Sequence, residues 1–164
     1  MNETSLWVSM KRGMEKYWDA SRHEDCVGVG VPDVSFGLFD NNPLSSPQGP
    51  QGWIELKSHK AWPKRGATLL DTHLTSVQRR WLMSRGKTGA SCWLLMRVEQ
   101  DILLYYWTNL PPRKATQREL RCGAVAVWHR KVGWELLRKK LWENNVLPIR
   151  MIDGVENHPF TPFK

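Results

Sequence analysis

Apolar residues recur at every fourth position near the start of the chain and then in short runs, which predicts a helix followed by strands. The first pattern covers residues 4–20 and has the spacing of one helix face. Two apolar runs, at about residues 32–39 and 52–58, flank a Pro-, Gly- and Ser-rich segment and predict two strands joined by a flexible loop. The apolar stripe of the helix is expected to pack on these strands; it consists of Leu6, Met10, Met14 and Trp18.

A second helix is expected after a basic loop. Residues 59–74 carry several cations and are interrupted by Pro63 and Gly66, which favours a loop. Thr75 and Gln78 have the spacing of a capping box, and Gly86 fits a helix C-terminus. We therefore expect a helix from about Thr75 to Gly86.

The next section of the chain predicts a buried hairpin. Residues 91–98 and 102–107 are almost continuously apolar and are separated by three polar residues. Thr116 begins another capping-box pattern, which predicts a short helix, and residues 124–128 are typical of a short strand. These elements add strands and a helix to the same sheet.

The end of the chain is expected to contain one more helix and an irregular tail. Leu137 and Leu141 lie on one face of a helix over residues 134–143, whereas residues 147–164 contain three prolines and no periodicity. We expect a single domain over residues 1–146 and an irregular tail over 147–164. The element order predicts an α/β (α+β) fold with a mixed central sheet flanked by helices.

Composition points to a polyanionic partner. The 164 residues include 24 Lys and Arg against 16 Asp and Glu, which gives a net charge of +8 and a pI of about 9.7. For a basic domain the commonest such partner is nucleic acid. No apolar run is long enough to span a bilayer and no signal peptide opens the sequence, so we expect no membrane association and a cytoplasmic location.

Two carboxylates and an amine are predicted to meet at the edge of the sheet. Asp33 follows a proline at the start of the first strand, and Glu55 and Lys57 lie two residues apart in the second, so their side chains leave the same face. Asp33, Glu55 and the backbone carbonyl of Leu56 could bind Mg²⁺ or Mn²⁺. Lys57 could orient a nucleophilic water or stabilise charge on a phosphate. Alternatively, Asp33 caps a turn, and Glu55 and Lys57 form the solvated face of an edge strand.

These residues resemble the motif of a known nuclease superfamily. Pro32-Asp33, Glu55-Leu56-Lys57 and Gln78 are similar to the PD-(D/E)XK pattern, and most of all to the virus-type replication–repair nucleases (VRR-Nuc) and related phage and Holliday-junction endonucleases. The resemblance covers roughly residues 4–107. It implies a restriction-endonuclease-like α-β-β-β-α-β core, Mg²⁺ as cofactor and a DNA phosphodiester as substrate.

The resemblance also implies further site residues. Gln78 matches the downstream glutamine of the family, although its capping-box position explains it equally well. The superfamily often adds an acidic residue from the first helix region, and Glu24, in a polar turn near the expected metal, is preferred here over Glu15. The catalytic set predicted in this way is Asp33, Glu55, Lys57, Glu24 and Gln78.

Basic residues near this centre could contact the DNA backbone. Such contacts would be largely independent of sequence and sensitive to salt. The alternative for each residue is an ordinary solvated basic surface. The predicted set is Lys60, Lys64, Arg65, Arg79 and Arg80.

The leading functional hypothesis is a Mg²⁺-dependent DNA endonuclease, selective for DNA structure and encoded by a phage or mobile element, acting in replication, recombination or DNA processing. Its partner would be double-stranded or branched DNA, a homodimer would place two sites on two strands, and its location would be the host cytoplasm. Two alternatives stay open: a non-catalytic nucleic-acid-binding module on the same fold, and a basic phage protein that binds a host protein.

Overall fold

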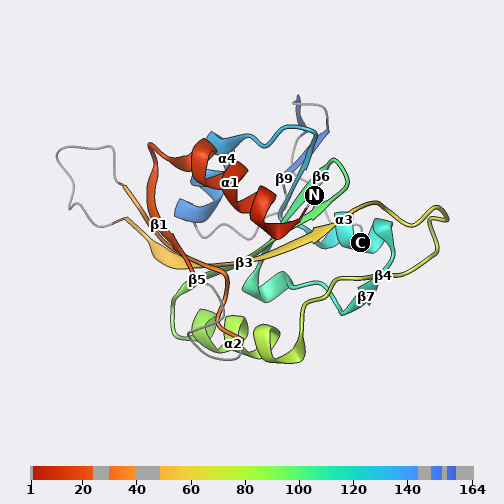
Figure 1. The fold of residues 1–164 in the computed structure, drawn as a ribbon, viewed down its shortest axis with the longest axis horizontal. Coiled ribbons are helices and arrows are strands. Elements are labelled where there is room, and N and C mark those ends of the chain that lie inside the picture. The colour runs from red at the N-terminus through yellow and green to blue at the C-terminus, as the bar shows by residue number, and fades with distance from the viewer. Residues whose placement is uncertain (1, 24–29, 40–48, 144–148, 153–154, 158–164) are drawn as a thin grey trace, which may run out of the picture.

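The computed structural model describes residues 2–23, 30–39, 49–143, 149–152 and 155–157. Within them, one mixed sheet separates helices on its two faces, and Figure 1 shows α1 and α4 on one side of the central strands and α2 on the other. In chain order the elements are α1 (Glu3–Met14), β1 (Trp18–Arg22), β2 (Val34–Leu38), β3 (Gln51–His59), β4 (Leu70–Asp71), α2 (Ser76–Lys87), β5 (Ser91–Val98), β6 (Asp101–Tyr106), the 3-10 turn η1 (Trp107–Asn109), β7 (Lys114–Ala115), α3 (Gln117–Gly123), β8 (Ala126–His129), α4 (Trp134–Glu143), β9 (Ile149–Ile152) and β10 (Val155–Asn157).

The main sheet has the strand order β1-β2-β3-β5-β6-β8-β9-β10. Its neighbours are antiparallel except for β3–β5 and β8–β9, which are parallel. From α1 to β5, apart from the two-residue β4, the order is α-β-β-β-α-β. The expected mixed fold is therefore confirmed.

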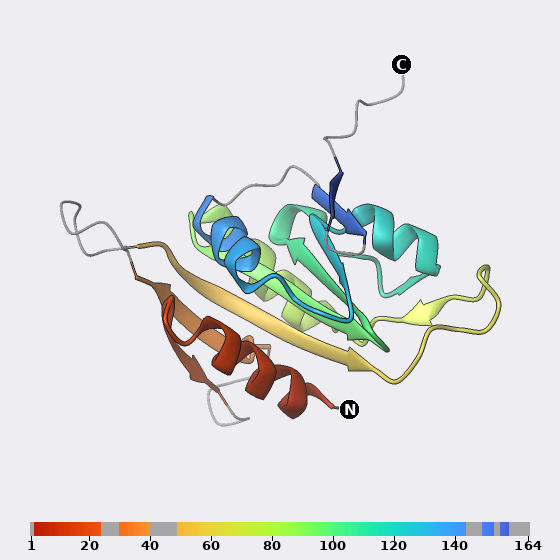
Figure 2. The same ribbon diagram turned by 90° about the horizontal axis from the view of Figure 1, so that it is seen from above.

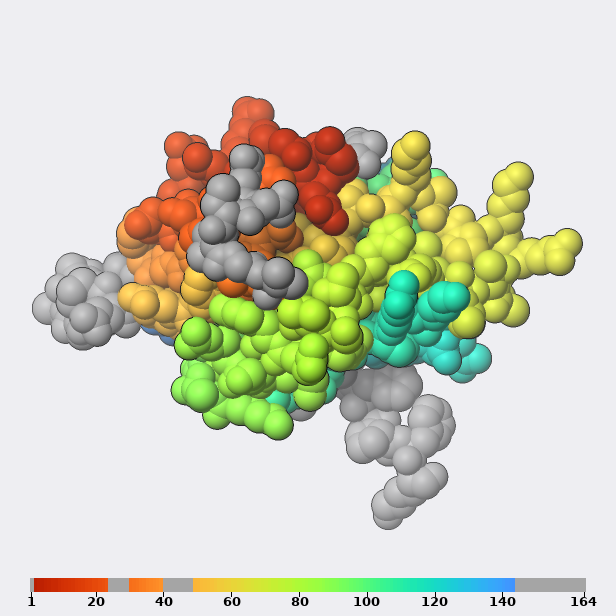
Figure 3. Space-filling model, turned by 60° about the horizontal axis from the view of Figure 1, so that its bottom comes forward, coloured from red at the N-terminus to blue at the C-terminus, as the bar shows by residue number. Residues whose placement is uncertain are grey.

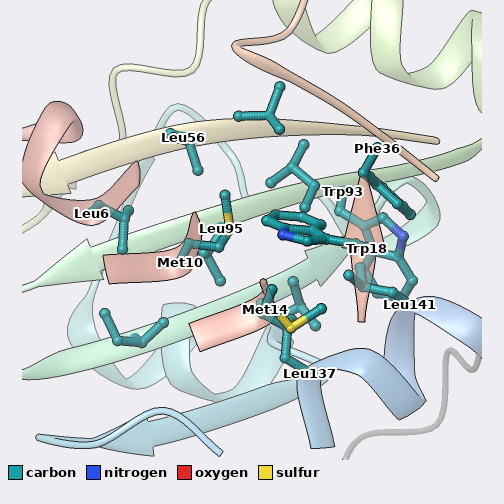
Figure 4. Packing of buried hydrophobic residues seen from close by; sticks show 14 of the residues in the cluster. Leu6, Met10, Met14, Trp18, Phe36, Leu56, Trp93, Leu95, Leu137 and Leu141 are labelled. Atoms are coloured by element: carbon teal, nitrogen blue, oxygen red, sulfur yellow. The ribbon is translucent and has the colours of Figure 1, made fainter. Parts of the chain in front are cut away.

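Two apolar cores lie on opposite faces of the sheet, because alternate residues of each central strand point to opposite sides. The first core packs α1 and α4 on the sheet, and Figure 4 shows Met10, Trp93 and Leu137 among its side chains. The second core packs α2 and α3 through Leu82 and Leu120 against β5 and β6. β3 lies between the two cores, so its side chains are buried on both faces.

Two local expectations differ from the structure. The opening helix ends at Met14, and Trp18 begins the edge strand β1. Gly86 does not end α2; the helix continues to Lys87, and Gly89 takes the left-handed conformation with φ 93°. Gly86 instead allows close packing on Trp107, because a Cβ there would lie 2.3 Å from the Trp107 ring.

The segment expected to be an irregular tail contains two strands. β9 extends the sheet beside β8, and β10 pairs with β9. The expectation of irregular structure over residues 147–164 is therefore wrong for 149–152 and 155–157. Within the described part of the chain, no helix is long and apolar enough to cross a membrane.

Candidate active site

The site forms where β2 stops pairing with β3. The last residues in register are Val34 and Ile54, so β3 continues beyond the end of its neighbour. The next backbone N–H on that edge belongs to Leu56, and it donates to Asp33 Oδ2 at 2.8 Å. The carboxylate of Asp33 thus takes the place of a strand partner. Because the N–H and C=O of one strand residue point to the same side, the Leu56 carbonyl is directed to this edge as well.

Glu55, Lys57 and Gln78 meet on the adjoining face of β3. Lys57 Nζ lies 2.6 Å from Glu55 Oε1, and Gln78 Nε2 donates to the same oxygen at 2.5 Å. Glu55 is fully buried and Lys57 is 7% exposed. The other carboxylate oxygen, Glu55 Oε2, has no hydrogen-bond partner among the described residues. The two charged groups are therefore buried together, which excludes the alternative that they form a solvated strand face.

Gln78 holds two positions at once. Its backbone N–H donates to Thr75 Oγ1 at 3.2 Å, and its side-chain Oε1 accepts from the Thr75 N–H at 3.1 Å. The same side chain donates its amide N–H to Glu55. The capping box and the site contact, posed as alternatives from the sequence, are both present in the structure.

The environment perturbs both ionisable groups of this pair. Burial raises the pKa of Glu55 from 4.5 to about 7; Lys57 lowers it in part, and Asp33 raises it further. Burial alone would lower the pKa of Lys57, but the attraction of Glu55, with Glu3 and Asp33, leaves it raised above 10.5. Lys57 therefore remains a cation at neutral pH.

An acidic residue that the sequence did not single out reaches the site from α1. Glu3 Oε1 lies 3.8 Å from Lys57 Nζ. Glu15 is exposed at the other end of α1, and Glu24 lies outside the described residues. Glu3 follows Asn2, the N-cap, where an acidic residue is typical of any helix start, so its position carried no separate signal.

The donor set fits a hard divalent ion. Asp33, Glu55 and the Leu56 carbonyl offer only oxygen atoms, and a bound ion would give the unpartnered Glu55 Oε2 a partner. Mg²⁺ is commonly held by one or two carboxylates together with substrate phosphates. Among the described residues no group of three or more His, Cys, Asp or Glu side chains is placed to hold a metal.

The five expected DNA-contacting residues differ in their surroundings. Lys60, Lys64, Arg65 and Arg80 are exposed. The Arg79 guanidinium instead donates to the carbonyls of Leu110 and Pro111, and it holds that segment against α2. In Figure 2 the loop after β3, which carries Lys60, Lys64 and Arg65, extends away from the body of the molecule.

Comparison with known proteins finds similarities of fold among solved structures. The sequence matches no protein-family model and no curated protein. One solved structure with a similar arrangement is Hjc, a Holliday junction resolvase from Archaeoglobus fulgidus. It shares 15% sequence identity over 73% of this chain and 88% of that chain, with a TM-score of 0.47. A similarity of this size carries no argument about chemistry, which depends on the side chains described above.

Proposed function

We propose that the protein is a metal-dependent nuclease that hydrolyses phosphodiester bonds in DNA. The observation that carries the proposal is Glu55, a buried carboxylate bonded on one oxygen by Lys57 and Gln78 and unpartnered on the other, beside Asp33. Burial of an ion pair is unfavourable unless its geometry is good, and removing one partner is strongly destabilising. Such pairs, with strongly shifted pKa values, are typical of functional sites.

The residues have separate roles in this proposal. Asp33, Glu55 and the Leu56 carbonyl would hold Mg²⁺ or Mn²⁺, which would neutralise charge on the phosphate and lower the pKa of water. Lys57 remains protonated at neutral pH, so it stabilises negative charge on a phosphoryl oxygen and does not act as a general base. Gln78 fixes the orientation of Glu55 through its amide N–H.

The proposed substrate is DNA with branches, nicks or flaps. The net charge of +8 favours a polyanion, and the exposed cations of the loop after β3 lie beyond the end of the strand that carries Glu55 and Lys57. Contacts of this kind recognise the phosphate backbone and its shape, and they do not depend on the base sequence. A domain of this size has little surface for reading bases as well.

The test compares cleavage of plasmid, single-stranded and four-way-junction DNA in Mg²⁺ or Mn²⁺. We expect the wild-type protein to cut, and Asp33→Asn and Lys57→Ala to lose about a hundredfold or more in rate. Asp19→Asn, an exposed residue of β1, is the matched control and should cut at the wild-type rate. Intact DNA of all three kinds with either metal would refute the proposal. DNA binding without cleavage would then support a binding module.

A further inference from the structure

A pocket distinct from the candidate active site lies between the start of α2 and the ribbon formed by β4 and β7. We name it the β4–α2 pocket. Its volume is about 440 Å³, within the range of pockets that hold small ligands. Its lining combines cationic and polar groups from three segments of the chain, among them His73, Thr75, Arg79 and Arg113.

Arg113 is the cation of the pocket best placed to bind an anion. Its side chain is 78% exposed, and its Nε lies 3.4 Å from Asp71 Oδ2. An exposed ion pair of this kind contributes little, so the guanidinium can turn to a phosphate, which it matches in two-pronged geometry.

The backbone that carries Arg113 is held firmly. The fully buried Thr72 donates both its N–H, at 2.7 Å, and its hydroxyl, at 3.1 Å, to the Arg113 carbonyl. Arg79 fixes the preceding segment, residues 110–111, as described above. The side chain of Arg113 therefore extends from a backbone that is held in place, as a binding residue requires.

His73 lines this pocket and contacts His59 of β3, the strand that carries Glu55 and Lys57. Its backbone takes a φ of 56°, and its N–H donates to Asp71 Oδ1 at 2.9 Å. The ring packs on His59 with 4.8 Å between centroids. His59 is nine-tenths buried two residues after Lys57 on the same face of β3, and its Nε2 has no hydrogen-bond partner among the described residues. The nitrogen-bearing side chains of Lys57, His59 and His73 therefore form a series from the candidate active site to the pocket.

Gln78 provides a second connection. Thr75, in the pocket lining, gives its N–H and hydroxyl to Gln78 Oε1, and Gln78 in turn donates to Glu55. One turn of α2 therefore faces the pocket and the candidate active site together. In Figure 3 the loop after β3, the start of α2 and the segment around β7 lie on one face of the molecule.

The chemistry of the lining selects the type of ligand. Asp71 is its one carboxylate, and its charge is offset by the Arg113 guanidinium and the His73 N–H. The cations exceed this single negative charge, and none of the residues that line the pocket within the described chain is Phe, Tyr or Trp. These features suit a phosphate group better than a stacked base.

We propose that the β4–α2 pocket binds a backbone phosphate that flanks the one being cut, through Arg113 and His73. This inference rests on the proposed nuclease function and adds to it a second contact on the same DNA strand. Beyond the pocket, the same DNA strand would pass along the exposed Lys60, Lys64 and Arg65.

The first test measures binding of fluorescent four-way-junction and duplex DNA in EDTA, where no cleavage takes place. Arg113→Ala should weaken binding about tenfold at low salt and reduce the slope of log Kd against log salt by about one. Arg118→Ala removes an exposed arginine of α3 outside the pocket and should leave that slope unchanged. Arg113→Lys should keep the slope. Because Arg113 is exposed, each variant should melt at the wild-type temperature, which thermal melting checks.

The second test locates the phosphate by replacing one phosphate at a time with a neutral methylphosphonate. At one flanking position the wild-type protein should lose about tenfold in affinity, whereas Arg113→Ala should be indifferent to the replacement there. Equal slopes for Arg113→Ala and Arg118→Ala, or no position with this behaviour, would overturn the inference. If these binding results fail but the wild-type protein cuts DNA, the phosphate-binding pocket is refuted and the nuclease function stands. If the binding results are as expected but the protein never cuts DNA, the nuclease function is refuted and the phosphate-binding pocket stands.

Discussion

Titration of Glu55 should make the metal-free protein less stable as the pH rises from about 4.5 to about 7. Burial raises the pKa of Glu55 from 4.5 to about 7 in the folded state, so between these values the folded chain holds a proton that the unfolded chain has released. Stability rises with pH only where the unfolded state binds more protons, and here the folded state binds more. The contribution is fully present below pH 4.5 and is lost as the pH passes through about 7.

The size of the effect follows from the same two pKa values. Each pH unit between them corresponds to about 1.4 kcal/mol, so the loss across the window is about 3 kcal/mol. Glu55 is fully buried, so solvent screening does not reduce this value as it would on the surface. It is a large fraction of the stability of a domain of this size.

The assay is urea unfolding in EDTA, followed by fluorescence of the ten tryptophans, at several pH values from 4.5 to 8. Glu55→Gln is the control, because its side chain has nearly the same shape and does not titrate. Because Glu55→Gln also removes the attraction that raises the pKa of Lys57, the same pair of curves is measured in a Lys57→Met background. The difference between the two curves isolates Glu55. A flat difference, or one in which the wild-type protein gains stability with pH, would refute the reasoning.

Two further predictions concern α1 and α2. Glu3→Gln removes a partly exposed ion pair at the site and should lower kcat/KM for DNA cleavage about fivefold, whereas Glu15→Gln at the far end of α1 should have no effect. Gly86→Ala should destabilise the protein by about 1–3 kcal/mol in urea unfolding, because the added methyl group overlaps with Trp107. The control is Gly66→Ala, where no heavy atom lies within 4 Å of the added carbon, and it should change stability by less than about 1 kcal/mol. Equal effects of the two substitutions would contradict the packing argument.

The order of elements could be predicted from sequence because it depends on local patterns. The capping boxes at Thr75 and Thr116 and the continuous apolar runs of β5 and β6 are such patterns, and they form as expected. Trp18 shows where local information ends. It continues the fourfold spacing of α1 and enters the same core, yet it pairs with Leu38 of β2 as a strand residue. Strand pairing is a contact between distant segments, and helical spacing does not report it.

The candidate site shows the same division. Glu55 and Lys57 are two residues apart in one strand, so their shared face follows from the sequence. Glu3 could not be found in this way, because its contact with Lys57 depends on how the start of α1 is placed over β3. The β4–α2 pocket likewise requires Arg113 to be brought beside His73 by the pairing of β4 with β7.

The position of Asp33 explains why the fold and the proposed chemistry have to be separated by a conservative substitution. Its carboxylate accepts the Leu56 N–H at the point where β3 has lost its neighbour, so part of its role is to complete the sheet. Asp33→Ala would leave that N–H without its acceptor and would remove a metal ligand, and a loss of cleavage would then have two causes. Asp33→Asn retains a carbonyl oxygen for Leu56 and removes only the charge. Loss of cleavage in the asparagine variant, with unfolding unchanged, therefore reports on the metal and the phosphate and not on the strand edge.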